Sequence, residues 1–441
     1  MLEAAVELRE GRGPYDAADV KVCFLTNDLQ LSGGVGVLIH HARQLHDHHG
    51  FEVWLVLVRE QEDPSWSHEA LQGLRVASFD EARAETGGPF DLAISTWWET
   101  TYSLFDVPAE RYVSFVQSLE DRFYRADEEE RLPAALMLDL PVAFLTEATW
   151  ISETLADLRP DAACHLIRNG VEKDIFTPVE AIDRDDARPL RILVEGYADI
   201  WFKGVNAAID AVAAMAEPHV LTVVAPNRDG LRAEHADRVV GPVTQREMAA
   251  LYAQTDVVLK LSQVEGMYGP PLEGFHGGAT CVTTEVTGHD EYIRHGENAL
   301  LCDWDDLRGT ARQLDLLARD RELLHRLREG ALATARAWPD WETQGAEMAV
   351  ALRAIRDAPP PDPYAHAGRL LADLRAGVHV QRLLLRERRD ALGKLKRYER
   401  LKRVPGVRQG LALKGSRSGR LLLRVARPAT RRVKRKLLGS G

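Results

Sequence analysis

Short apolar runs alternate with stretches of helical spacing along most of this chain. Such runs, placed between helical stretches, are typical of strands in a parallel sheet that is covered on both faces. A first series of predicted strands lies at 21–27, 52–58, 91–96, 111–117, 142–147 and 165–171. A second series lies at 190–196, 219–226, 238–243, 256–262, 280–286 and 299–303. The repeated rhythm predicts an α/β protein with two doubly wound parallel sheets.

A polar stretch at 178–189 separates the two series and reads as a linker. Two Rossmann-like halves in one chain imply a cleft between them, where a ligand is expected to bind. Helices are predicted at 305–337 and 341–356, with a break at Trp338-Pro339-Asp340. The expected domains are therefore an amino-terminal half at 1–180, a second half at 190–340, a helix at 341–358 that crosses back to the first half, and a Pro-rich joint with a basic tail at 359–441.

The tail carries a charge opposite to that of the rest of the chain. Residues 381–441 contain 21 Lys and Arg against three acidic residues, a balance of +18, while the whole chain has a net charge of −11. Leucines recur at helical spacing among these arginines, which suits attraction to anionic lipid at about 1 kcal/mol per basic residue. A coiled coil or partner helix at 368–404 is the alternative. Nucleic-acid binding is not favoured, because the tail contains only one aromatic residue, Tyr398.

Composition places the chain among ordinary globular proteins, with 441 residues, 45% hydrophobic and 28% charged. No run approaches the roughly 20 apolar residues of a membrane span, and the first residues are too acidic and polar for a signal peptide. We therefore expect a cytoplasmic protein, with a peripheral position at the inner face of the membrane left open. The four cysteines lack metal-ligand spacing and are read as reduced core residues.

Two glutamates, Glu265 and Glu273, flank a stiff segment of glycine and proline just after the predicted strand at 256–262. Ligands of open α/β sheets bind at the carboxyl ends of the strands. A carboxylate there accepts strong hydrogen bonds from hydroxyl groups, so the pair suits a polyhydroxylated ligand such as a sugar or a ribose. The alternative is that a glutamate near a helix start only favours the helix dipole.

A glycine-rich loop at 32–36 follows the first predicted strand and opens a helix, so its amides suit an anion. It lacks the G-x-G-x-x-G spacing and the acid about 20 residues on, which argues against a nicotinamide-dependent oxidoreductase. A tight turn between strand and helix also needs such glycines without any ligand.

Several segments together resemble the GT-B glycosyltransferases of family 4, which are retaining nucleotide-sugar transferases. These segments are SGGVGVLIHHARQL, IRNGVEKDIFTP at 167–178, FKG at 202–204, VEGMYGPPLEGFHGGATCV and TGHDEYIRHGENALL, in order over residues 20–355. FVQSLEDRFY and VTGHDEYI look most like bacterial polysaccharide-assembly members, including rhamnosyltransferase-like ones. The resemblance implies a GT-B fold with two Rossmann-like domains facing a cleft, a nucleotide sugar as donor, a glycan or lipid-linked acceptor, and no cofactor or catalytic metal.

The resemblance also assigns roles to particular residues. It implies that Glu265 contacts the donor sugar, that Glu273 binds the ribose and that Lys203 neutralises the diphosphate. The implied catalytic set is Glu265, Lys203 and Gln117. The implied donor-binding set is Gly33, Gly34, Lys203, Gly241, Pro242, Val243, Glu265, Gly266, Met267, Tyr268, Gly269 and Glu273. Trp97, Trp98 and Glu99 are candidates for the acceptor side, with core packing as the alternative.

Two positions depart from the family pattern. Tyr197 stands where the family usually has an arginine, so that phosphate contact is missing or comes from Arg168 or Arg228. Gln117 stands where many members carry a histidine, and a glutamine can position a sugar but cannot act as a general base. These departures motivate the alternative of a catalytically silent binding or scaffold module.

Overall fold

The computed structural model describes residues 20–359 except 31, 60–70 and 86, and most of 371–396. Its first sheet has seven parallel strands in the order β3-β2-β1-β4-β5-β6-β7. The strands are β1 Val20–Thr26, β2 Phe51–Leu57, β3 Arg75–Ser78, β4 Phe90–Ser95, β5 Ala109–Val116, β6 Ala143–Thr146 and β7 Cys164–Leu166. The helices and turns between them are α2 Gly33–His49, α4 Phe79–Arg83, α5 Trp98–Ser103, η1 Leu104–Asp106, η2 Glu120–Phe123, α6 Arg131–Leu136, η3 Met137–Asp139 and α7 Thr149–Leu158.

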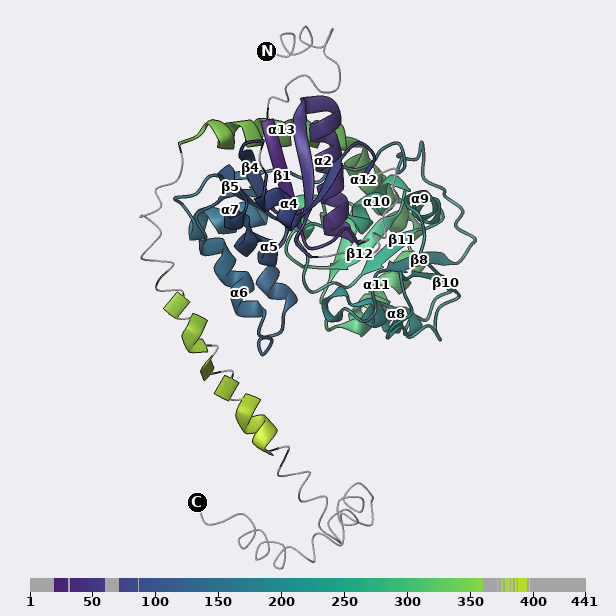
Figure 1. Cartoon of the computed structure of the whole chain (residues 1–441). Helices are drawn as coiled ribbons and strands as arrows, with labels where there is room; N and C mark the ends of the chain where they lie inside the picture. The colour runs from purple at the N-terminus through teal and green to yellow at the C-terminus, as the bar shows by residue number, and fades with distance from the viewer. Residues whose placement is uncertain are drawn as a thin grey trace, which may run out of the picture. The chain divides into compact units, whose positions relative to one another are not determined.

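The second sheet has six parallel strands in the order β10-β9-β8-β11-β12-β13, which repeats the Rossmann-like order of the first. The strands are β8 Leu190–Glu195, β9 His219–Val224, β10 Arg238–Val240, β11 Val257–Lys260, β12 Thr280–Thr284 and β13 Ala299–Cys302. Around them lie η4 Trp201–Lys203, α8 Val205–Ala213, α9 Gln245–Tyr252, α10 Pro270–His276, η5 His289–Glu291, α11 Leu307–Arg319 and α12 Arg321–Ala337, and the last helix in sequence is α13 Trp341–Asp357. The two predicted parallel sheets are confirmed (Figure 1).

Burial on both faces explains why the central strands form. In β1, Val22 and Phe24 point into one apolar cluster and Cys23 and Leu25 into another, and all four are fully buried. A strand that is apolar on both faces can be stable only where helices cover both sides of the sheet.

The structure differs most from the sequence prediction at one missed strand and two predicted elements. Strand β3 was missed because only Ala77 of its four residues is buried, so it has no apolar run. The strand expected at 165–171 ends at Leu166. The single helix expected at 305–337 is two helices, because Asp320 leaves the helical conformation and its side chain caps α12 by accepting from the backbone N–H of Leu323.

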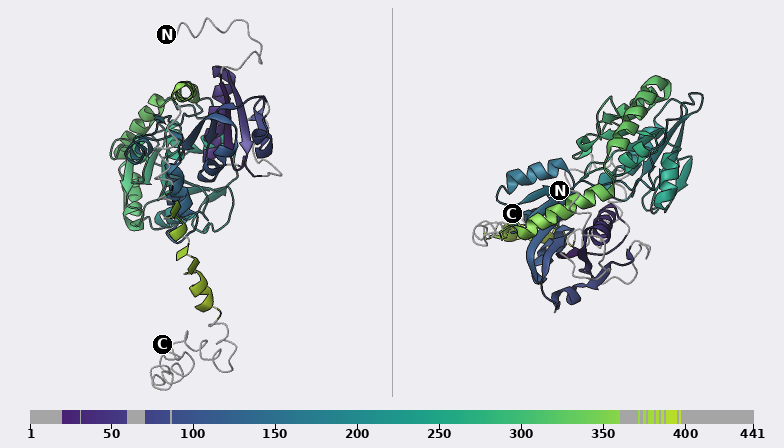
Figure 2. Two further views of the ribbon diagram at one scale, coloured as in Figure 1. Left: turned by 60° about the vertical axis from the view of Figure 1, so that its left-hand side comes forward. Right: turned by 90° about the horizontal axis from the view of Figure 1, so that it is seen from above.

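Helix α13 follows the second sheet in sequence but packs on the first. Met348, Leu352 and Ile355 of α13 lie in the same buried cluster as the residues of β1 and β2. Figure 2 shows this helix as the long green ribbon beside the purple and blue strands. The chain therefore passes between the halves twice, once near 170–180 and once near 340.

These two passages touch each other. The backbone N–H of Val171 donates to the carbonyl of Pro339 at 3.2 Å, and the indole N–H of Trp338 donates to the carbonyl of Asn169 at 2.9 Å. A Cβ on Gly170 would lie 2.5 Å from the backbone of Asp340 and Trp341, so only glycine fits there. The outgoing and returning segments form one joint.

Residues from Leu371 on form a separate unit. Its described residues are helical between 371 and 396 and expose the apolar side chains Leu371, Leu374, Val378, Val380, Leu383, Leu385 and Leu392. Most of the basic tail predicted from the sequence lies outside the described residues. Within the part of the chain that is described, no helix is both long and apolar enough to span a membrane.

Candidate active site

The centre of the site is an ion pair at the carboxyl end of β11. Both carboxylate oxygens of Glu265 lie 3.0 Å from the Lys203 Nζ. The Glu265 side chain is 10% exposed and that of Lys203 26%, so the lysine lies nearer the solvent. An ion pair with this exposure can keep its geometry and still present an ammonium to an incoming anion.

The Lys-Gly sequence at Lys203 is required by packing. Gly204 has a φ of 65°, and a Cβ on it would lie 2.1 Å from the carbonyl oxygen of Leu261 in the segment after β11. Only glycine permits this approach and this backbone conformation. Gly204 therefore fixes Lys203 next to the loop that carries Glu265.

A second lysine, which the sequence did not single out, lies beneath this pair. Lys260 ends β11 and is buried, with its Nζ 2.8 Å from Glu195 Oε1 and 3.6 Å from Glu265 Oε1. Burial alone would lower the pKa of Lys260, but Glu195 and Glu265 raise it above its usual value. The sequence signal that could have identified Lys260 is its charge inside an otherwise apolar strand.

The two glutamates of the segment have opposite pKa shifts. Burial raises the pKa of Glu265, but Lys260 and then Lys203 oppose it, and the net pKa lies below the usual value. Burial and the nearby Glu195 raise the pKa of Glu273 to about 7. Glu265 is therefore ionised at neutral pH, whereas Glu273 changes its charge there.

The loop after Glu265 rests on the strand ends of the first sheet. A Cβ on Gly266 would lie 1.7 Å from the carbonyl oxygen of Gln117 and 2.5 Å from Glu147 Oε1. Gln117 follows β5, and its Nε2 donates to the carbonyl of Gly34 at 3.3 Å. The structure thus brings together Gly34, Gln117, Gly266 and Glu265, which the sequence places far apart.

Glu147 holds the loop from the other side and was missed by the sequence analysis. It follows β6 and accepts hydrogen bonds from the Met267 backbone N–H at 3.1 Å and from Asn169 Nδ2 at 2.8 Å. Burial raises its pKa to about 8, despite these two hydrogen bonds. Its indole neighbour Trp150 donates to the Gly266 carbonyl at 2.8 Å, so both faces of the loop backbone are held.

This raised pKa predicts how stability depends on pH. Between the usual carboxyl pKa and about 8, the folded protein binds a proton at Glu147 that the unfolded chain has released, so stability falls as pH rises. In this range the bound proton makes the free energy of unfolding fall by up to about 1.4 kcal/mol per pH unit. Glu147→Gln removes this contribution to the pH dependence. We expect the melting temperature of the variant to gain on the wild type from pH 6 to pH 8. Parallel melting curves at pH 6, 7 and 8 would contradict this assignment.

Residues 190–320, which contain Lys203, Lys260, Glu265 and Glu273, match the family described as Glycosyl transferases group 1. Solved structures match the described architecture more broadly, at 16% identity and a TM-score of 0.63 for HepE of Anabaena with UDP and glucose. That match covers 76% of this chain and all of HepE.

The chain has a GT-B fold, and its residues 190–320, called the group 1 domain below, match the Glycosyl transferases group 1 family.

A second solved structure agrees with this fold, and one curated sequence matches part of the chain. Sucrose-phosphate synthase of Thermosynechococcus elongatus is 17% identical, with a TM-score of 0.63 over 76% of this chain and 99% of that chain. In sequence, the N-acetyl-alpha-D-glucosaminyl L-malate synthase of Bacillus anthracis is 37% identical over 95 residues, or 22% of this chain. The match spans a quarter of the length of that synthase.

Other predicted donor residues of the group 1 domain lie around the same sheet edge. Tyr268 is buried and its backbone carbonyl accepts from the Tyr292 hydroxyl at 2.9 Å, while Gly269 precedes α10. Gly241, Pro242 and Val243 follow β10, the edge strand, with β9 and β8 between them and β11. A Cβ on Gly241 would lie 2.2 Å from the carbonyl oxygen of Ala225, so this loop is packed against the end of β9.

The amino-terminal side presents Gly33 and Gly34 at the start of α2. Ser32 caps this helix by accepting from the Val35 backbone N–H at 3.2 Å. A Cβ on Gly33 would have no atom within 4 Å, so packing within the chain does not explain this glycine. Its role in anion binding stays a prediction.

The three acceptor-side candidates differ in their surroundings. Trp98 is buried, with its indole N–H donating to the Tyr124 hydroxyl at 3.0 Å, which favours packing. Trp97 stacks on Phe123 with ring centroids 5.8 Å apart. Glu99 accepts from Asn27 Nδ2 at 2.6 Å and pairs with Arg59.

Arg168, one of the two arginines considered for the missing phosphate contact, already has partners. Its Nε lies 3.0 Å from Glu291 Oε2, and its terminal nitrogen donates to the Thr149 hydroxyl at 3.1 Å. The ion pair joins the segment after β7 to η5 of the group 1 domain. Tyr197, which replaces the family's arginine, follows β8 in the same domain.

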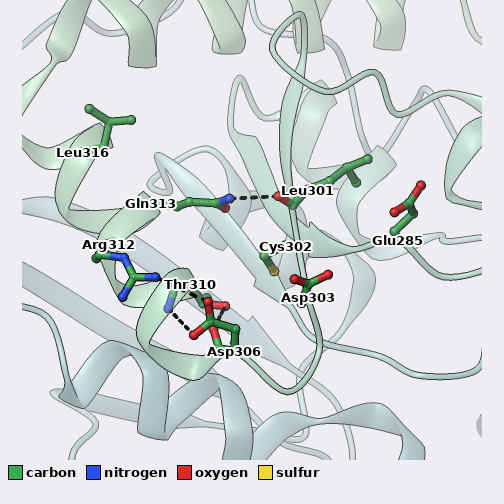
Figure 3. A pocket seen from close by; sticks show the side chains of 10 residues that line it. Glu285, Leu301, Cys302, Asp303, Asp306, Thr310, Arg312, Gln313 and Leu316 are labelled. Atoms are coloured by element: carbon green, nitrogen blue, oxygen red, sulfur yellow. Dashed lines mark hydrogen bonds and ion pairs between the residues drawn. The ribbon is translucent and has the colours of Figure 1, made fainter.

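A cavity of about 420 Å³ lies elsewhere in the group 1 domain, between β13 and the start of α11 (Figure 3). Its acidic lining includes Glu285, Asp303 and Asp306, and Asp306 caps α11 by accepting from the Gly309 backbone N–H at 2.8 Å. In the described part of the chain, no group of three or more His, Cys, Asp or Glu could hold a metal ion.

Proposed function

We propose that the protein transfers a sugar from a nucleoside diphosphate sugar to a hydroxyl acceptor, with retention of configuration. The observation that carries this proposal is the Lys203–Glu265 pair at 3.0 Å in the group 1 domain, next to Gly266, which packs against Gln117 of the other half. It supplies a cation for a diphosphate and a carboxylate for sugar hydroxyls at one place. HepE, a structural neighbour, was solved with UDP and glucose, which supports a nucleotide sugar as the donor.

The residues divide the reaction between them. The ammonium of Lys203 faces the charge that develops on the leaving diphosphate as the bond from the sugar carbon to the phosphate oxygen breaks. Glu265 accepts hydrogen bonds from the sugar hydroxyls, and Glu273 accepts them from the ribose. The acceptor oxygen bonds to the sugar carbon on the face that the diphosphate leaves, and its proton passes to the leaving phosphate oxygen. Gln117 positions the sugar and does not titrate.

A panel of nucleotides tests the proposal. UDP, GDP and dTDP, and their sugars, should include at least one ligand that raises the melting temperature, since ligand at 100 times its Kd stabilises a fold by about 2.7 kcal/mol. Release of the diphosphate from that sugar in the presence of hydroxyl acceptors then measures turnover. A hexosyl or deoxyhexosyl donor is our expectation. Absence of any shift would contradict the proposal.

Glu273 makes nucleotide binding depend on pH. With a pKa of about 7, it is mostly protonated at pH 6 and ionised at pH 8, and only the carboxylate accepts with both oxygens. We expect the affinity for the nucleoside diphosphate to rise over this range. Glu273→Gln should bind about tenfold more weakly at pH 8, because a bond to a charged acceptor is worth more than one to a neutral amide.

Calorimetric titrations at pH 6, 7 and 8 measure this effect. The wild type and Glu273→Gln should have nearly equal affinities at pH 6 and diverge as the pH rises. A constant ratio across the three titrations would show that Glu273 does not face the nucleotide. The ratio also cancels the titration of the phosphates, which is common to both proteins.

The acceptor is proposed to be a glycan or lipid-linked precursor in bacterial cell-surface polysaccharide assembly. Structural neighbours include WaaB, a lipopolysaccharide outer core galactosyltransferase that is 14% identical, with a TM-score of 0.57. The +18 balance of residues 381–441 supports a tether to anionic membrane. Sedimentation with anionic vesicles, compared with neutral vesicles, tests the tether separately from transfer.

A catalytically silent binding module is the second candidate. It is favoured by Gln117, which cannot titrate, and by Tyr197 in place of the family's arginine. Such a module would bind a nucleotide sugar without releasing the diphosphate. Slow hydrolysis or transfer with any donor in the panel would exclude it.

A further inference from the structure

Lys260 carries a buried charge, and the proposed reaction assigns it no role. It ends the central strand β11, all four residues of which are buried, and its side chain is 5% exposed. Its Nζ lies 2.8 Å from Glu195 Oε1, 3.6 Å from Glu265 Oε1 and 5.9 Å from the centre of the Tyr268 ring. A lysine in this position loses most of its hydration, so its charge must be compensated by these neighbours.

Two lysines and two carboxylates form one charge cluster. Glu265 lies between Lys203, which is 26% exposed, and Lys260 beneath it, and Glu195 at the end of β8 completes the set. The four charges sum to zero. Without Lys260, one ammonium would face two carboxylates, and the cluster would carry a net negative charge next to Lys203.

That balance matters for an anionic ligand. Charges a few ångströms apart in a partly buried site interact much more strongly than they do in water. A net negative cluster would repel the diphosphate that Lys203 attracts. Glu195 also lies close enough to Glu273 to raise its pKa, so Lys260 acts on both glutamates of the 265–273 segment.

We propose that Lys260 is a positioning residue for the donor, whose ammonium neutralises Glu195 and Glu265 and so lets Lys203 hold the diphosphate. Lys260 lies below Glu265 and acts through it, without touching the nucleotide. This inference rests on the proposed function, since it concerns the same donor site. It assigns to a residue inside a strand the charge balance on which phosphate binding depends.

Paired ligands and paired variants test the role. UDP, GDP and dTDP are each titrated against the corresponding uncharged nucleoside, with Lys260→Met, Lys260→Met/Glu195→Gln and Lys21→Met. We expect Lys260→Met to lower the affinity for the diphosphate at least tenfold and the affinity for the nucleoside less than threefold. The double variant restores a neutral cluster and should regain diphosphate affinity to within about threefold of the wild type.

Lys21→Met is the matched control. Lys21 pairs with Glu85 at 3.4 Å, is 17% exposed and lies near the amino end of β1, whereas the site lies at the carboxyl ends of the strands. Its loss should leave both affinities unchanged. Melting curves of all variants verify that each is folded before titration.

The possible outcomes separate the two proposals. If the wild type binds a diphosphate and Lys260→Met binds it equally well, the role of Lys260 is wrong and the proposed function stands. Equal losses for diphosphate and nucleoside, or no recovery in the double variant, would show that Lys260 only supports the fold of the site. If the wild type binds no diphosphate, the proposed function itself fails.

Discussion

Replacing Glu265 with glutamine is expected to lower kcat for sugar transfer by about 10²–10³-fold, the loss seen when one preorganised polar contact to a reacting group is removed. The carboxylate is held between Lys203 and Lys260, at 3.0 and 3.6 Å. An amide of the same size keeps the volume but accepts weaker hydrogen bonds from the sugar hydroxyls. It also leaves Lys203 without its anionic partner.

Steady-state release of the diphosphate, with donor and acceptor at saturation, measures this loss. Glu329→Gln is the matched control, because Glu329 lies on α12, pairs with Arg184 and has a side chain that is 54% exposed. An exposed pair of this kind contributes about 0–1 kcal/mol and should not alter kcat. Turnover of Glu265→Gln within tenfold of the wild type would remove Glu265 from the catalytic set.

A single methyl group on Gly266 should be almost as damaging. A Cβ there would lie 1.7 Å from the Gln117 carbonyl oxygen, and backbone cannot move aside as a flexible side chain can. The loop from Glu265 to Gly269 must then shift away from the first sheet. A displacement of about 1 Å in a site can cost about 100-fold in rate, so we expect Gly266→Ala to lower kcat/KM by at least that factor.

Gly269→Ala, in the same loop, is the contrast. A Cβ on Gly269 would have its nearest neighbour, Glu273 Oε1, at 4.0 Å, and its φ of −78° suits alanine. Its loss in kcat/KM should be at least tenfold smaller than that of Gly266→Ala. Equal losses would mean that the loop requires flexible backbone rather than close contact with Gln117.

The strand pattern could be predicted because the central strands are mostly apolar on both faces, and this produces runs such as 256–262, in which Lys260 is the charged residue between the two ends. The edge strand β3 could not, since three of its four residues are exposed. The break at Asp320 was also hidden, because the apolar spacing continues across it into α12 and only the capping aspartate marks the end of one helix.

The candidate site was predicted only in part, for a physical reason. Lys203, Glu265 and Glu273 lie in a loop and at helix starts, where charged residues stand out from the sequence. Glu147 acts through a contact with Met267, 120 positions away. Lys260 acts through a contact with Glu265, five positions away, and lies inside a strand. A sequence shows that such a charge is unusual, but the partner that compensates it is visible only in the fold.

The joint formed by Gly170 and the segment before α13 has the geometry of a hinge between the two halves. Both covalent links between the halves meet there, tied by the Val171–Pro339 and Trp338–Asn169 hydrogen bonds. One half would therefore rotate about this joint relative to the other. Small changes in the backbone torsions at Gly170 would then produce large changes in the distance between Gly266 and the first sheet. Access of donor and acceptor to Lys203 would then be controlled by a few backbone torsions far from the reacting atoms.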